Sequence, residues 1–213
     1  MNASPTLRVD VWSDYVCPFC YLELPEIQRL EGQFNDQIAV VWRAFELRPE
    51  PNPTLDPNAQ YLHNTWNRTV YPLAENRGMK LKLPPVQPRS RKAQEAAAFA
   101  ETHGRFNAMH EALFRAFFEH GRDIGDIEVL CAVAAEIDEL DPFDLRQALE
   151  ENRYTAEVLD DEQLARALGI NGVPIMVLRA QDAPWEEGLP LRGAVPYDML
   201  ETAVNEALVR LRS

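Results

Sequence analysis

The stretch LRVDVWSDYVCPFC, residues 7–20, decides the fold of this protein. Leu7, Val9 and Val11 alternate with other side chains, which predicts a β-strand over residues 7–12. Pro18 suits the first turn of a helix, where its missing N–H costs no hydrogen bond. Apolar positions at helical spacing then predict a helix that ends at Gly32. The pair Cys17 and Cys20 therefore lies where a strand passes into a helix.

The segments on either side complete an α/β pattern. Residues 37–47 are nearly all apolar, which predicts a second strand covered on both faces. After a long helical region, Gly172-Val173-Pro174 predicts a turn into a strand that ends at Leu178, followed by a short strand over 189–192 and a helix over 196–211. Strand–helix–strand and strand–strand–helix are the two halves of a thioredoxin-like fold. We therefore predict an α/β thioredoxin-like domain from residues 1–56 and 166–213, with a large α-helical insertion over 57–165.

A Cys-x-x-Cys pair at a helix start has a definite chemical use. Unpaired N–H groups and the helix dipole favour an anion there, and the thiolate is the nucleophilic form of cysteine. Two-residue spacing lets the second sulfur displace a mixed disulfide from the first. We assign Cys17 as the nucleophile and Cys20 as the buried resolving thiol.

Two other interpretations of the pair are weaker. A structural zinc ion needs four ligands, and neither Cys131 nor the four histidines stand at a supporting spacing. Two inert core cysteines would not explain the position at a helix start. Cys131 itself lies on an apolar helical face and is interpreted as a small core residue.

Composition narrows the function further. The 213 residues carry a formal net charge of −13, which disfavours binding to nucleic acid and to anionic membranes. No run of 18 apolar residues predicts a transmembrane helix. Residues 1–6 are polar and lack the basic and apolar regions of a signal peptide, so we expect a cytoplasmic protein.

Cys17-Pro18-Phe19-Cys20 after a strand, together with Gly172-Val173-Pro174 before another, resembles the DsbA family of the thioredoxin superfamily, and more narrowly its cytoplasmic FrnE-like branch. The resemblance implies a thiol–disulfide oxidoreductase in which Pro174 is cis and lies beside the cysteines. It also implies that Pro18, Phe19, Val173 and Pro174 contact the substrate, with the Val173 backbone free to pair with an extended segment. Without the cysteine pair, Pro174 would be interpreted as a trans turn proline.

The residue between Pro18 and Cys20 bears on the reduction potential. Strong oxidants of this family commonly have histidine there, and its positive charge stabilises the thiolate. Phe19 offers no such charge, so we predict a less oxidising couple.

The same superfamily branch contains glutathione-dependent enzymes of the 2-hydroxychromene-2-carboxylate isomerase and kappa transferase types, which form the alternative prediction. Those enzymes usually have serine in place of Cys17 and lack Cys20. A non-catalytic module whose helical insertion holds a ligand is the third alternative.

The remaining expectations concern partners and one acid. The substrate is a thiol or disulfide, either protein or small molecule, with glutathione as a candidate redox partner and no bound cofactor or metal. Glu46, at the end of the second strand, is a candidate proton acceptor beneath Cys20, with a strand-end surface acid as the alternative. Tyr15 and Tyr21 are expected to line the groove or to pack beside it. Substrate identity, reaction direction and oligomeric state stay open.

Overall fold

The computed structural model describes residues 7–211; residues 1–6 and 212–213, which the sequence assigns to the thioredoxin-like domain, lie outside the described residues. A four-stranded sheet has the order β2-β1-β3-β4. β1 and β2 are parallel, whereas β3 is antiparallel to both β1 and β4. The strands are β1 (Leu7–Ser13), β2 (Ile38–Ala44), β3 (Ile175–Ala180) and β4 (Leu189–Arg192).

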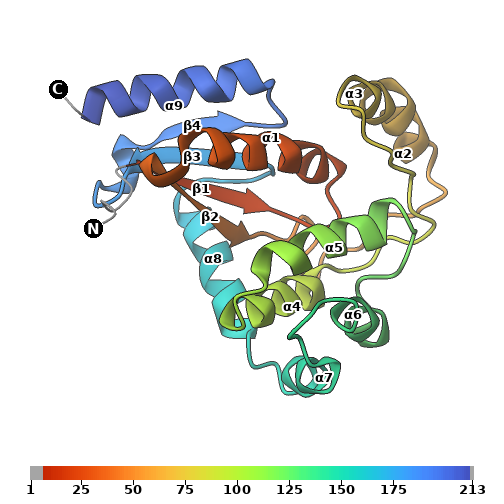
Figure 1. Ribbon diagram of the computed structural model, residues 1–213. Coiled ribbons are helices and arrows are strands. Elements are labelled where there is room, and N and C mark those ends of the chain that lie inside the picture. The colour runs from red at the N-terminus through yellow and green to blue at the C-terminus, as the bar shows by residue number, and fades with distance from the viewer. Residues whose placement is uncertain (1–6, 212–213) are drawn as a thin grey trace.

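Helices cover both faces of the sheet (Figure 1). α1 (Pro18–Phe34) and α9 (Tyr197–Leu211) pack on one face, where Leu7, Val9 and Val11 belong to their apolar cluster. α8 (Thr155–Ala167) packs on the other face, against Trp12. The alternation of side chains predicted for the first strand is confirmed, and so is the α/β thioredoxin-like fold.

The helices between β2 and α8 form a separate group beside the sheet (Figure 1). They are α2 (Gln60–Thr65), a π-helical turn (Trp66–Val70), α3 (Tyr71–Asn76), α4 (Arg91–Thr102), α5 (Phe106–Phe118), α6 (Ile127–Ala134) and α7 (Pro142–Glu150), and short 3₁₀ turns stand elsewhere at Asn35–Gln37 and Trp185–Glu187. The predicted division of the chain into two domains stays a prediction, and its boundary at residues 165 and 166 falls inside α8.

The second strand is covered on both faces, as expected, because α1 packs against one face and α8 against the other. β2 is an edge strand that pairs with β1 on one side, and every residue in it after Ile38 is partly exposed. Its apolar run reflects the packing of its side chains against α1 and α8 and does not require a neighbour on each side.

One apolar cluster joins the cysteine motif to the helical insertion. Cys17, Cys20 and Tyr21 pack in the same cluster as Phe114 and Phe118 of α5. The motif therefore lies where α1 meets the helices between β2 and α8. None of the helices within residues 7–211 combines the length and the apolar character that crossing a bilayer requires.

Candidate active site

Cys17 occupies the N-cap position of α1, and Pro18 is the first residue of the helix. The Cys17 amide donates to the carbonyl of Asp14 at 3.0 Å, and the Cys20 amide donates to the carbonyl of Cys17 at 3.1 Å. These two bonds close the turn that carries the chain from β1 into the helix. Cys17 and Cys20 are both buried, at 3% and 1% exposure, and both are free thiols.

The two sulfur atoms have different surroundings. Cys17 Sγ donates to the carbonyl of Val173 at 3.5 Å. Burial raises the pKa of the Cys20 thiol well above its usual value, and its hydrogen bond with the Cys17 thiol raises this pKa further. Cys20 therefore holds its proton, and Cys17 is the sulfur next to the groove described below.

Sheet pairing places the Gly172-Val173-Pro174 turn beside the cysteine pair. Trp12 near the end of β1 pairs with Ile175 at the start of β3, so the residues beyond both strand ends meet. The Val173–Pro174 peptide bond is cis, as the resemblance implies, and the Pro174 carbonyl accepts from the Gly193 amide at 2.8 Å. The carbonyl of Val173 was expected to be free for a substrate. In this structure it accepts a hydrogen bond from the Cys17 thiol.

Asp14 anchors the turn before the cysteines. Its carboxylate accepts from the Val16 amide at 3.2 Å and from the Leu47 amide at 2.6 Å, and its side chain is fully buried. Burial raises the pKa of Asp14 to about 6, although the hydrogen bond from Leu47 opposes this shift. One carboxylate thus ties the motif to the segment that follows β2.

A groove of about 280 Å³ opens beside Cys17. Pro18, Phe19 and Val173 line it together with Cys17, and its far wall comes from the inserted helices, including Trp66 and Phe118. The structure therefore brings three of the predicted substrate-contacting residues to one opening. The fourth, Pro174, follows Val173 but is not among the residues that line this groove.

Glu46 is buried at 5% exposure, so the alternative of a strand-end surface acid is wrong. Its carboxylate accepts from the Arg91 guanidinium at the start of α4, and Arg91 also lies 3.6 Å from Glu162 of α8. Burial and the neighbouring Glu162 carboxyl raise the pKa of Glu46 to about 7. The acid is bound to Arg91 and not to either cysteine, and its predicted role as a proton acceptor stays a prediction.

Neither tyrosine lines the groove; both pack beside it, against α5. The Tyr15 hydroxyl is hydrogen-bonded to Nδ1 of His110 at 2.7 Å, and the Tyr21 hydroxyl donates to Glu119 at 2.5 Å. His110 is buried on α5, and burial lowers its pKa to about 3, so its imidazole is neutral near pH 7. These contacts join the motif to α5 and make both tyrosines structural supports.

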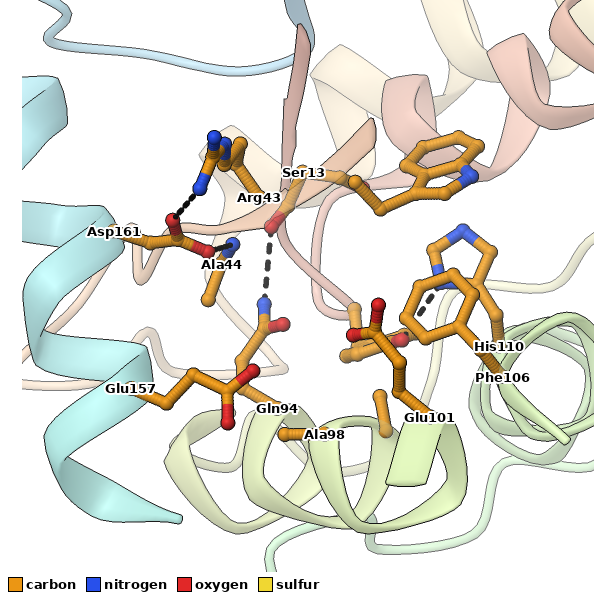
Figure 2. A pocket seen from close by; sticks show the side chains of 13 residues that line it. Ser13, Arg43, Ala44, Gln94, Ala98, Glu101, Phe106, His110, Glu157 and Asp161 are labelled. Carbon is orange, nitrogen blue, oxygen red and sulfur yellow. Dashed lines mark hydrogen bonds and ion pairs between the residues drawn. The ribbon is translucent and has the colours of Figure 1, made fainter. Parts of the chain in front are cut away.

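A second cavity, which Tyr15 helps to line, lies between β2 and the helices α4, α5 and α8 (Figure 2). Its volume is about 40 Å³, far below the few hundred Å³ of a small-molecule pocket. Gln94 donates to the Ser13 carbonyl there at 3.0 Å, and Asp161 binds Arg43 and the Ala44 amide. These bonds hold α4 and α8 against the edge of the sheet, and the cavity is too small for a thiol substrate. Within residues 7–211, no three His, Cys, Asp or Glu side chains are grouped to hold a metal ion.

Comparison with known proteins places this arrangement in a family. The family model described as the DSBA-like thioredoxin domain matches residues 8–205. The chain is also 31% identical over 210 residues to the uncharacterized protein YwbO of Bacillus subtilis, with 94% of this chain and 97% of that protein covered. The chain belongs to the DSBA-like thioredoxin domain family.

Solved structures agree with this assignment. A probable DsbA oxidoreductase from Streptomyces coelicolor is 25% identical, with a TM-score of 0.78 over 94% of this chain and 89% of that chain. A 2-hydroxychromene-2-carboxylate isomerase is 19% identical, with a TM-score of 0.73 over 93% of this chain and 95% of that chain. The cytosolic disulfide reductase DsbM of Pseudomonas aeruginosa, solved with GSH, is 20% identical. Its TM-score is 0.64 over 93% of this chain and 99% of that chain. The last two likenesses concern the fold alone.

Proposed function

We propose that this protein is a cytoplasmic thiol–disulfide oxidoreductase whose redox couple is Cys17 and Cys20. The observation that carries the proposal is the pair of hydrogen-bonded thiols at the start of α1, facing the Val173 carbonyl beside a groove. Membership in the DSBA-like family supports thiol–disulfide chemistry, and the cytosolic neighbour DsbM is consistent with the compartment.

In the oxidised protein, a substrate thiolate attacks Cys17 Sγ. The Cys17–Cys20 bond breaks, its electron pair goes to Cys20 Sγ, and this sulfur takes up a proton. A second substrate thiolate then attacks the substrate sulfur of the mixed disulfide, which forms the substrate disulfide and releases Cys17 as a thiolate. The reverse sequence reduces a disulfide, and there Cys20 must lose the proton that its raised pKa retains.

The substrate is a protein or small-molecule thiol or disulfide, with glutathione as the candidate redox partner, and Pro18, Phe19, Val173 and Pro174 form the substrate-binding surface. When Cys17 is deprotonated or disulfide-bonded, it no longer donates to the Val173 carbonyl. That carbonyl is then available to an extended substrate segment.

Insulin reduction by dithiothreitol tests the proposal. We expect wild-type protein to accelerate it, Cys17→Ser to abolish the acceleration, and Cys131→Ser to retain it as the matched control. Cys20→Ser should accumulate a mixed disulfide through Cys17. Equal rates for wild type and Cys17→Ser would refute the proposal.

The fold of the 2-hydroxychromene-2-carboxylate isomerase keeps a glutathione-dependent isomerase as the second candidate. A groove of about 280 Å³ also suits a small molecule. The two functions differ in their need for Cys20, because an isomerase has no mixed disulfide to resolve. Glutathione-dependent isomerisation of 2-hydroxychromene-2-carboxylate that Cys20→Ala leaves intact, together with no disulfide exchange by the wild type, would favour the isomerase.

A further inference from the structure

The groove beside Cys17 differs in charge from the rest of the molecule. The chain has 34 acidic and 21 basic residues, yet the sixteen residues that line this groove include no acid and one cation, Arg48. The other walls are mainly apolar, with Leu62 and Trp66 among them. Local charge in the groove is therefore positive in a strongly acidic protein.

Arg48 has no ion-pair partner among residues 7–211, although acids stand close to it in the chain. Glu46 is bound to Arg91, and Glu50 is paired with Arg89 at 3.3 Å. The neighbouring carboxylates are thus engaged by other arginines. The Arg48 guanidinium remains available to a ligand in the groove.

The backbone around Arg48 is fixed relative to the nucleophile. The Leu47 amide donates to the Asp14 carboxylate, whose other oxygen accepts from Val16 next to Cys17. The Arg48 carbonyl accepts from Arg89 at 2.8 Å. Binding a ligand at Arg48 would therefore not require this segment to be ordered first.

We propose that Arg48 determines specificity by binding a carboxylate on a small thiol or disulfide substrate whose sulfur reacts at Cys17. A guanidinium matches a carboxylate through two parallel N–H···O bonds. The groove has the size of a small-molecule site, and its apolar walls suit the hydrocarbon part of such a substrate. The inference rests on the proposed oxidoreductase function and names the substrate class for it.

The test measures how fast three small thiols reduce the Cys17–Cys20 disulfide. The thiols are 3-mercaptopropionate, which is anionic, 2-mercaptoethanol, which is neutral, and cysteamine, which is cationic. Each rate for wild type is divided by the rate for Arg48→Met, so that the intrinsic reactivity of each thiol cancels. Arg210→Met removes the same charge from an exposed side chain of α9, a helix that contributes no residue to the groove.

We expect a ratio of about 5 for 3-mercaptopropionate, which is the upper end for an exposed ion pair. The ratio should be near 1 for 2-mercaptoethanol and below 1 for cysteamine. Arg48→Lys should recover part of the rate with the anionic thiol, and Arg210→Met should change none of the three.

Equal ratios for the three thiols, or an Arg210→Met effect as large as that of Arg48→Met, would overturn the role of Arg48 while leaving the redox function in place. A wild-type protein that none of the thiols reduces would overturn the proposed function together with this inference.

Discussion

At the scale of single residues, some side chains of the site can be identified from the sequence and others cannot. The cysteine pair, Pro18 and Pro174 are recognisable from short-range spacing. Asp14 is not: its bond to Val16 is a local turn that the sequence pattern permits, but its bond to Leu47 spans 33 residues. Its importance, like that of Arg48, follows from tertiary contacts alone.

Asp14 should make stability depend on pH. Its pKa is raised from 3.8 to about 6 in the folded protein, so folding favours its protonated form. The contribution to stability is complete below about pH 4 and is lost as the pH rises through about 6. Between pH 5 and 7.5, the free energy of unfolding of wild type should fall by on the order of 1 kcal/mol more than that of Asp14→Asn.

Urea titrations at the two pH values measure this difference. The amide that Asp14→Asn introduces keeps one acceptor oxygen, so a uniform loss of stability in the variant is expected and is not the readout. Identical pH dependence in both proteins would show that the Asp14 carboxyl does not titrate as its burial implies.

Phe19 should limit the reduction potential. A histidine in its place would put positive charge beside the Cys17 thiolate and stabilise the reduced form. We expect Phe19→His to raise the potential by roughly 30 mV, which is about a tenfold change in the redox equilibrium. Phe19→Leu is the uncharged control and should leave the potential near that of wild type. A potential for Phe19→His at or below the wild-type value would contradict this account.

At the scale of elements, α1 and α9 agree with the helices predicted to end at Gly32 and to span 196–211 to within a few residues, because amphipathic spacing and capping residues are local signals. The long helical region contains a feature of another kind, the π-helical turn Trp66–Val70 between α2 and α3. Both ends of that turn line the groove beside Cys17. A single extra residue in a helical turn leaves no clear trace in apolar periodicity, so the sequence does not predict it.

Arg77, at the C-cap of α3, joins three elements. It donates to Glu23 of α1 at 2.8 Å and to the Val195 carbonyl before α9 at 2.7 Å. Glu23 is fully buried, and burial raises its pKa to about 7 despite the bond from Arg77. Arg77 therefore connects the end of α3 to α1 and to the segment before α9, with Glu23 as its fully buried ion-pair partner.

Arg77→Met should lower the free energy of unfolding by about 3 kcal/mol or more, because it leaves Glu23 buried without its partner. Arg153→Met removes an exposed ion pair with Glu151 and should lower the free energy of unfolding by about 1 kcal/mol at most. Denaturant unfolding at pH 8 checks both values, and Glu23→Gln in the Arg77→Met background should recover part of the loss. If Arg77→Met and Arg153→Met lose the same free energy of unfolding, the buried Arg77–Glu23 pair does not hold these elements together.

At the scale of the whole molecule, the α/β thioredoxin-like fold follows from the sequence, whereas the core shared by the motif and the helices between β2 and α8 does not. The cluster around the cysteines includes side chains of α1 and of α4 to α7. Separating the parts would expose Phe114 and Phe117, which are fully buried. Domain boundaries predicted from the order of strands and helices do not reveal this shared packing.

The shared core should make the protein unfold as a unit. We expect urea transitions followed by far-UV circular dichroism and by tryptophan fluorescence to coincide. Trp12 reports on the sheet and Trp66 on the inserted helices. Two separated transitions would show instead that the insertion is an independently stable domain.

The most direct test of the whole account is the redox state of the cysteines across a series of glutathione buffers, read by alkylation and intact mass. We predict a reversible Cys17–Cys20 disulfide with a midpoint well below the roughly −120 mV of the strongest oxidants in this superfamily, while Cys131 stays alkylated throughout. If Cys17 and Cys20 both remain alkylated in every buffer, the two thiols do not form a redox couple and the account is wrong.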